Sequence, residues 1–185
     1  MELTDRSAIA EVCAGNSDAY RVLVDRHSRN IFRLAYRMTG NEQDAEDVVQ
    51  EAFLRAYRQI QKFDSRSSFS TWLYAIAANY SRDLIRARNR RQEHHSPSDD
   101  DAAGLAESIP SPAPAPDRVA FSGQLQSLIG PALDRLSASE RTAFVLRHYE
   151  GLGIDEIAGA LGIQASAAKQ SVFRAVHKLR RALQP

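Results

Sequence analysis

A proline-rich, acidic stretch in the middle of the chain is the feature that most constrains its fold. Residues 92–117 hold five of the seven prolines and almost no large apolar residues, so this stretch cannot bury a hydrophobic core. Four of these prolines, from Pro110 to Pro116, alternate with small residues, which favours an extended segment. The pattern predicts a flexible linker at 92–117 between two small domains, 1–91 and 118–185.

The linker is also acidic. It carries six Asp and Glu residues, and no lysine or arginine lies between Arg91 and Arg118. Two interpretations follow from this charge. The linker is a soluble spacer, or it is an acidic tether that mimics nucleic acid inside a basic channel.

The first domain shows helical periodicity. Apolar residues recur at three- and four-residue steps across 45–60 and again across 73–84, which is typical of amphipathic helices. Ser68 or Ser70 can cap the second of these helices. Two further helices are expected before Gly40, and four helices up to about Arg91 predict a compact bundle.

The second domain has the pattern of a helix-turn-helix. Ser137 and Glu140 have the spacing of a capping box and should start a helix. A short helix over 154–161 follows, then a turn at Gly162 and a longer helix. The sequence therefore predicts an all-α fold, with a helical bundle and a helix-turn-helix joined by a flexible linker rich in proline and aspartate.

Composition excludes several classes of protein. The net charge is +1, so nucleic-acid binding requires local segregation of charge. The single cysteine, Cys13, rules out an internal disulfide, and its place beside Ile9 and Val12 predicts a buried small hydrophobe.

No apolar run is long enough to span a membrane, so we expect a cytoplasmic protein without membrane insertion. His94 and His95 lack partners at metal spacing and no catalytic constellation appears, so we expect no enzyme, metal or cofactor.

The longer helix of the helix-turn-helix carries the candidate DNA-reading residues. Gln170 and Arg174 lie one turn apart and suit adenine and guanine edges. Lys169 and Lys178 suit phosphate contacts. A solvated basic face is the alternative, as is a helix-turn-helix without DNA contact. The candidate DNA-binding residues of this helix are Ser166, Lys169, Gln170, Ser171, Phe173, Arg174 and Lys178.

Two blocks of the sequence resemble a known family. DAEDVVQEAFLRAYR followed by F-x-TWLYAIAxNxxRDxxR resembles region 2 of bacterial RNA polymerase sigma factors, in particular the small extracytoplasmic-function group (group IV). RTAFVLRHYEGLGIDEIAGALGIQASAAKQSVFRAVHKLR resembles region 4 of the same family. The two signatures occur in the expected order on either side of the linker. The resemblance implies a stress-response factor that binds the clamp and flap regions of core polymerase and recognises promoter DNA. An anti-sigma factor would control it.

The resemblance also implies roles for single residues. Region 2 would bind the −10 element and help to open the strands, with the 63–69 loop and Asn79 holding a flipped base and arginines following the backbone. Region 4 would bind the −35 element. The implied −10 residues are Phe63, Asp64, Ser67, Phe69, Trp72, Asn79, Arg82 and Arg86. The implied core polymerase contacts are Asp44, Asp47, Gln50, Glu51 and Arg55.

The sequence departs from the family pattern before and after Lys169. Ser166-Ala167-Ala168 stands where a Gly-Thr-Val run is common, and Ser171 stands where arginine is common. Affinity for the upstream element would be weaker or its sequence preference altered. Two other classes remain open. One is an operator-binding helix-turn-helix regulator that acts as a dimer, and the other is a sigma-like decoy that sequesters an anti-sigma partner.

Overall fold

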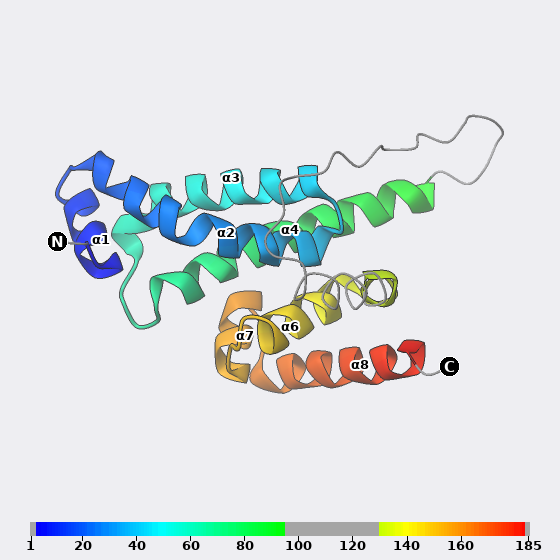
Figure 1. Ribbon diagram of the computed structural model, residues 1–185. Helices are drawn as coiled ribbons and strands as arrows, with labels where there is room; N and C mark the ends of the chain where they lie inside the picture. The colour runs from blue at the N-terminus through cyan, green and yellow to red at the C-terminus, as the bar shows by residue number, and fades with distance from the viewer. Residues whose placement is uncertain (1–2, 95–129, 184–185) are drawn as a thin grey trace, which may run out of the picture.

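The computed structural model describes residues 3–94 and 130–183, and all regular secondary structure in these ranges is helical. The predicted all-α class is confirmed (Figure 1). Most of the predicted linker lies outside the described residues. Residues 130–134 are helical and precede the C-terminal helices. The helices are α1 (Asp5–Cys13), η1 (Ser17–Ala19), α2 (Tyr20–Thr39), α3 (Glu42–Gln59), η2 (Ile60–Lys62), α4 (Phe69–His94), α6 (Ala138–His148), α7 (Ile154–Leu161) and α8 (Ala165–Leu183).

Helices α2, α3 and α4 pack on one another and form the N-terminal bundle. The predicted apolar stripe of α3 is confirmed, because Ala45, Val48 and Ala52 are fully buried. Gly40 ends α2 in the left-handed conformation, at φ 79°, which glycine adopts without a steric penalty. The side chain of Asn41 then caps α3 by accepting a 2.7 Å hydrogen bond from a backbone N–H of the first turn.

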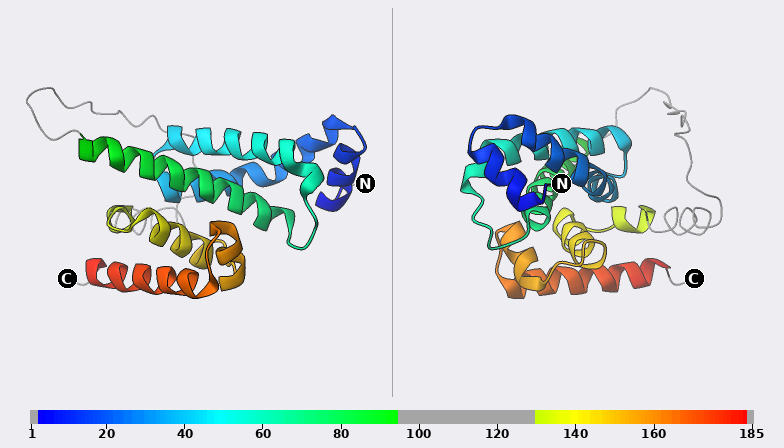
Figure 2. Two further views of the ribbon diagram at one scale, coloured as in Figure 1. Left: turned by 180° about the vertical axis from the view of Figure 1, so that it is seen from behind. Right: turned by 60° about the vertical axis from the view of Figure 1, so that its left-hand side comes forward.

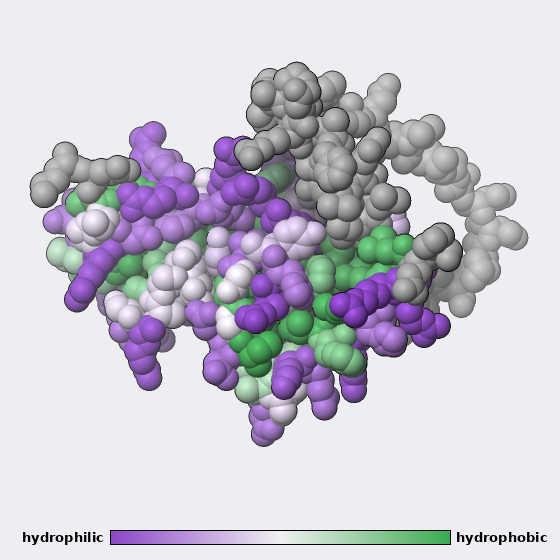
Figure 3. Space-filling view, turned by 60° about the horizontal axis from the view of Figure 1, so that its bottom comes forward, coloured by the Kyte–Doolittle hydropathy of each residue, from purple (hydrophilic) through white to green (hydrophobic). Residues whose placement is uncertain are grey.

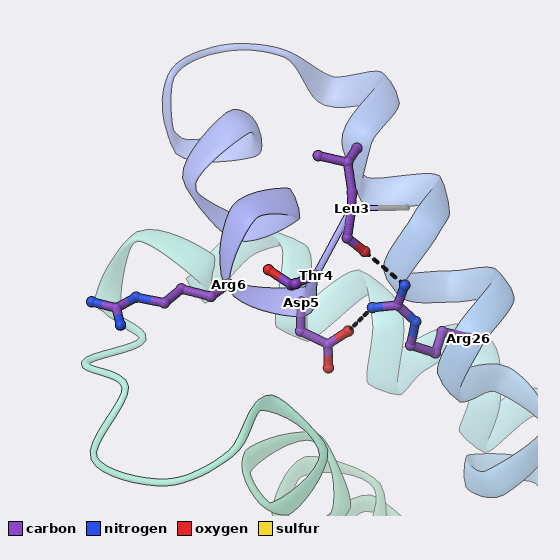
Figure 4. A pocket seen from close by; sticks show the side chains of 5 residues that line it. All are labelled: Leu3, Thr4, Asp5, Arg6 and Arg26. Carbon is purple, nitrogen blue, oxygen red and sulfur yellow. Dashed lines mark hydrogen bonds and ion pairs between the residues drawn. The ribbon is translucent and has the colours of Figure 1, made fainter. Parts of the chain in front are cut away.

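The first helix is anchored to α2 by a small polar cluster. Arg26 donates to the Leu3 carbonyl at 2.7 Å and to the Asp5 carboxylate, and the three residues line a shallow pocket (Figure 4). His27 Nε2 lies 2.8 Å from the other Asp5 oxygen. Cys13 is exposed at the end of α1, so its predicted burial is wrong. The buried positions of α1 belong to other residues on the same helix, Ala8 and Val12.

The C-terminal domain, residues 130–183, lies against the N-terminal bundle. Helices α6 and α7 pack on α4, and α6 also contacts α2 (Figures 1 and 2). Buried residues of both domains, such as Met38, Ala78 and Leu161, belong to one hydrophobic cluster. Arg141 Nη1 donates across the boundary to the Met38 carbonyl at 2.7 Å. The sequence predicted two domains and a tether, but not this docking.

Candidate nucleic-acid and polymerase interfaces

The loop before α4 has a defined conformation. Ser68 Oγ accepts a 3.1 Å hydrogen bond from the Thr71 N–H, so Ser68 is the cap of α4. The Asp64 carboxylate accepts a 3.1 Å bond from the Arg66 N–H and pairs with the Arg66 guanidinium. That backbone hydrogen bond, with the side chain of Arg66 second, holds the pKa of Asp64 below its usual value. The loop therefore holds the Asp64 carboxylate ionised and in a defined position, where it acts as a hydrogen-bond acceptor.

Three aromatic residues pack beneath this loop. The ring centroids of Phe63 and Trp72 lie 5.2 Å apart. The ring centroid of Phe69 lies 6.0 Å from that of Phe63 and 5.8 Å from that of Trp72. Phe69 is 3% exposed and also contacts His27, so it belongs to the core that supports the loop. Phe63, Ser67 and Trp72 are half-buried and keep part of their surface free. Stacking on a base is open to Phe63 and Trp72 rather than to Phe69.

Asn79, Arg82 and Arg86 share one face of α4, and that face meets the C-terminal domain. Asn79 Nδ2 donates to the Ala160 carbonyl at 2.6 Å, and Arg82 Nη1 lies 3.4 Å from the Leu161 carbonyl. Burial, followed by the charge of Arg86, lowers the pKa of Arg82. Among the described residues, Asn79 Oδ1 and Arg82 Nε are buried without a hydrogen-bond partner. Of the predicted −10 residues, Asn79 and Arg82 are therefore engaged by the C-terminal domain, while Arg86 is exposed at the edge of this contact.

The helix-turn-helix forms as its local signals predict. Ser137 and Glu140 make the predicted capping box at the start of α6. Gly162 ends α7 in the left-handed conformation, at φ 65°. Lys178 Nζ lies 2.7 Å from the Glu140 carboxylate. Burial raises the pKa of Glu140, but hydrogen bonds from Lys178 and Ser137 outweigh it, and the pKa lies below its usual value.

Helix α8 presents most of its candidate residues to solvent. Lys169, Gln170 and Arg174 are exposed, and Phe173 is 72% exposed with its ring 6.5 Å from that of His177. Figure 3 shows the side of the molecule that carries α8, where hydrophobic residues form patches among hydrophilic ones. An exposed aromatic between polar side chains is suited to apolar contact in a groove. Ser166 is also exposed, while Ser171 is half-buried and Lys178 is tied to Glu140.

The candidate polymerase surface on α3 divides into free and engaged residues. Asp47 and Gln50 are exposed on α3. Asp44 belongs to the cap of α3, where its carboxylate accepts from Asn41. Glu51 pairs with Arg55 at 2.6 Å, and the Arg55 guanidinium lies 4.8 Å from the ring centroid of Tyr80 on α4. Glu51 and Arg55 thus also hold α3 against α4.

A groove between α2 and α3 was not predicted from the sequence. Its α3 wall includes Leu54 and Tyr57, which are 50% and 43% exposed. Both are large apolar residues that lie outside the buried stripe of α3. This position in the sequence pattern is the signal from which an exposed apolar groove could have been predicted. The groove is lined by Ser17, Asp18, Tyr20, Arg21, Val24, Gln50, Phe53, Leu54 and Tyr57. Since Gln50 is among them, the groove extends the candidate polymerase surface.

Within 3–94 and 130–183 there is no group of three or more His, Cys, Asp or Glu residues that could hold a metal ion. None of the helices in these ranges is long and apolar enough to cross a membrane.

The structure combines a helical bundle with a docked helix-turn-helix, whose second helix is polar and exposed. This combination defines a two-domain helical DNA-binding protein. Residues 23–91 match the Sigma-70 region 2 family, and residues 128–179 match the Sigma-70 region 4 family. The ECF RNA polymerase sigma factor SigW of Bacillus subtilis is 34% identical over 99% of this chain and 98% of its own. The ECF RNA polymerase sigma-E factor of Escherichia coli is 32% identical over 100% of this chain and 96% of its own.

Solved structures agree with this relationship. The structure of CnrH in complex with the cytosolic domain of CnrY aligns with a TM-score of 0.67 and 26% identity, over 97% of this chain and 96% of that one. The sigma factor RpoE of Bartonella quintana, solved with the anti-sigma factor NepR, shares the fold, with a TM-score of 0.65 and 21% identity over 89% of this chain and 96% of that one. The chain belongs to the ECF-type RNA polymerase sigma factors. As such it directs promoter recognition and is not an enzyme.

Proposed function

We propose that this sigma factor binds core polymerase through α3 and the adjoining groove, and that its two domains read the two promoter elements. The exposed acidic residue Asp47, together with Gln50 and the apolar surface of Leu54 and Tyr57, forms a mixed surface on α3. Apolar area at the centre and charge at the edge is the anatomy of a stable protein interface. The clamp of core polymerase is the partner proposed for it, and the flap would contact the C-terminal domain.

Promoter DNA is divided between the loop before α4 and helix α8. Phe63 in the loop and Trp72 on α4 offer half-exposed aromatic rings near the ionised Asp64. This suits an unstacked base that needs both a stacking wall and a hydrogen-bond acceptor. On α8, Gln170 and Arg174 are exposed one turn apart, and the −35 element is their proposed target. The observation that carries the proposal is this exposed reading face of α8 on a chain that also has the region 2 bundle.

An anti-sigma factor is the proposed regulator. CnrH, which resembles this chain over nearly its whole length, was solved in complex with the cytosolic domain of CnrY. A partner of the same kind would compete for the α3 surface or for the face of α8.

The direct test is transcription in a reconstituted system. The purified chain is mixed with bacterial core RNA polymerase and a genomic promoter library, and the transcripts are sequenced. Initiation at defined sites that depends on the chain, with shared upstream sequences, is the expected result. A folded chain that neither binds core nor initiates would overturn the proposal. Binding of a palindromic operator as a dimer would then favour the stand-alone regulator, and capture of an anti-sigma factor alone would favour the decoy.

A further inference from the structure

A buried histidine links the first helix to the loop that is proposed to hold the melted strand. His27 on α2 is 8% exposed, although most buried positions of this helix are apolar. Its Nε2 lies 2.8 Å from one carboxylate oxygen of Asp5, the first residue of α1. Its ring centroid lies 5.4 Å from that of Phe69, the first residue of α4. One side chain therefore contacts both helices.

The two partners of His27 fix the orientation of its ring. An ionised carboxylate can only accept a hydrogen bond, so Nε2 carries a proton and donates it to Asp5. Asp5 is itself held, because its other oxygen accepts from Arg26, which also donates to the Leu3 carbonyl at 2.7 Å (Figure 4). The imidazole is thus anchored at its polar end, and its ring packs on Phe69 with an angle of 59° between the two ring planes.

Phe69 connects this anchor to the two rings that are proposed to stack on a base. It is 3% exposed, and its ring contacts those of Phe63 and Trp72. Protein interiors are close-packed, so displacement of a buried ring moves the rings that touch it. Phe63 and Trp72 are half-buried and form the candidate stacking surface. The contacts from Asp5 to this surface therefore pass through His27 and Phe69 alone.

The other end of the loop is also supported by α1. Helix α1 packs against η2, which leads directly into the loop. Ala8 and Val12 of α1 are buried in the same hydrophobic cluster as Ile60 of η2 and Phe69 of α4. Both ends of the 63–68 loop therefore depend on α1, one through apolar packing and the other through the buried histidine.

The hydrogen bonds of the loop are local. Among residues 3–94 and 130–183, every hydrogen bond of the 63–68 loop is made within 60–72. Ser65 has a left-handed conformation, at φ 58°, which is unfavourable for a residue other than glycine and persists only where the surroundings hold it. The position of the loop on the bundle is therefore set by the aromatic rings beneath it and by what supports those rings.

We propose that Asp5 and His27 are positioning residues for recognition of the −10 element, and that α1 sets the geometry of the strand-binding loop. Neither residue touches DNA. Asp5 holds the imidazole, the imidazole holds Phe69, and Phe69 sets the place of the stacking rings relative to the Asp64 carboxylate. A satisfied buried hydrogen bond fixes a direction, which apolar packing alone does not. This inference rests on the proposed function of the loop.

The variant Asp5→Ala separates positioning from simple electrostatics by its sign. It removes a negative charge, so electrostatics predicts equal or tighter binding of DNA. Loss of positioning predicts weaker binding of the strand, by about three- to tenfold for the loss of a charge-assisted hydrogen bond to a buried group. Asp25→Ala is the matched control, since it makes the same charge change at an exposed site on α2 and should bind like the wild type.

The binding experiment uses each variant assembled with core polymerase. The probe is a fluorescein-labelled oligonucleotide with the non-template −10 sequence of a promoter mapped in the transcription experiment above, and binding is followed by anisotropy. A second probe is a duplex that contains only the −35 element. Affinity for this duplex should change by less than about twofold, because the exposed residues of α8 belong to the other domain. A variant that merely damages the fold would weaken binding of both probes.

Variants of His27 divide the contact into its two halves. His27→Gln can still donate to Asp5 but lacks the ring that packs on Phe69, whereas His27→Phe keeps a ring and has no donor. Both should weaken strand binding. Adding Asp5→Ala to His27→Phe should weaken it little further, because the two residues act through one another. If Asp5→Ala does not fold, His27→Gln supplies the same readouts.

Trp72 is the single tryptophan of the chain, so its fluorescence reports on the loop without any DNA. In the free chain, Asp5→Ala and both His27 variants should increase the quenching of Trp72 by acrylamide, since its half-buried ring loses support. Asp25→Ala should give the wild-type value.

Three results overturn the inference. The first is Trp72 quenching that stays at the wild-type value in the Asp5 and His27 variants. The second is increased quenching together with wild-type affinity for the strand, and the third is an equal loss of affinity for the strand and the −35 duplex. In each case initiation by the wild-type chain leaves the proposed function standing, and only the positioning role fails. If the wild-type chain with core polymerase initiates at no defined site, the proposed function fails and the inference falls with it.

Discussion

The guanidinium of Arg141 on α6 donates to the carbonyl of Met38 on α2 at 2.7 Å, in a position that is 5% exposed. The same guanidinium donates to the Leu133 carbonyl through Nε at 3.0 Å and Nη2 at 2.6 Å. One side chain therefore satisfies carbonyls in both domains. Its planar fork makes this possible, because the donors point in fixed and different directions.

Arg141→Met should lower the free energy of unfolding by about 2–4 kcal/mol, since buried carbonyls lose their donors. Arg141→Lys should recover only part of this loss, because an ammonium cannot reproduce the fork. Urea unfolding followed by circular dichroism measures both. Arg135→Met, at an exposed position before α6, is the control and should change stability by less than about 0.5 kcal/mol. A similar small change for Arg141→Met would contradict the structural role.

Glu140 should stabilise the C-terminal domain in a pH-dependent way. Its folded pKa lies below the ordinary value of 4.5, so its contribution is present above the unfolded pKa and is lost as the pH falls through the folded pKa. Thermal unfolding of the wild type and of Glu140→Gln should show a gap in midpoint at neutral pH. The gap should close on acidification below about pH 4.5. A gap that is independent of pH would mean that the carboxylate charge contributes nothing.

The contribution of Glu150 should have the opposite pH dependence, and it should affect the docking of the two domains. Burial raises its pKa despite the hydrogen bond from Tyr74 on α4 and the charges of Arg37 and Arg33 on α2. A raised folded pKa gives a contribution that is complete below the unfolded pKa and is lost as the pH rises through the folded value. The radius of gyration should therefore decrease slightly when the pH is lowered from 7 toward the ordinary carboxylate pKa of 4.5. Glu150→Gln should remove this dependence.

Asp47→Arg should weaken binding to core polymerase by tenfold or more, about 1.4 kcal/mol, and leave the fold intact. Asp47 is exposed on α3, so its replacement costs little stability. Binding is measured by titrating labelled chain with core polymerase, and circular dichroism checks the fold. Asp155→Arg makes the same charge change in the C-terminal domain and should bind like the wild type. Equal affinity of the two variants would remove Asp47 from the interface.

Arg174→Ala should reduce selection of the upstream promoter element by about 1–3 kcal/mol if the guanidinium makes a bidentate base contact. Binding to promoter duplexes with single substitutions should become less discriminating at one position. Lys169→Ala is the comparison, because a phosphate contact weakens binding to all sequences alike and lowers its salt dependence. An equal loss on every sequence for Arg174→Ala would assign it to phosphate as well.

Local signals in the sequence were sufficient to predict most of the helices and several of their ends. The apolar stripe of α3, the Ser137–Glu140 capping box and the turn at Gly162 each depend on residues a few positions apart. They predicted the bundle and the helix-turn-helix. Cys13 shows the limit of this approach, since its apolar neighbours suggested burial but the helix turns it outward.

Contacts between distant segments could not be read in the same way. Asn79 meets Ala160 across 81 positions, and nothing in either local pattern marks the other as a partner. The polar face of α3 was likewise read as one surface, although Asp44 is hydrogen-bonded to Asn41, the cap of the same helix, and Arg55 packs on Tyr80. These assignments depend on packing between elements, which periodicity does not encode.

The cap that Asn79 places on α7 links two properties of this sigma factor that are usually considered apart. A substitution of Asn79 that changes its proposed contact with promoter DNA also removes its hydrogen bond to the Ala160 carbonyl. A variant with a new base preference at this position is therefore expected to pack α7 differently on α4. Redesign of specificity at Asn79 would need a compensating change near Ala160 to keep that packing.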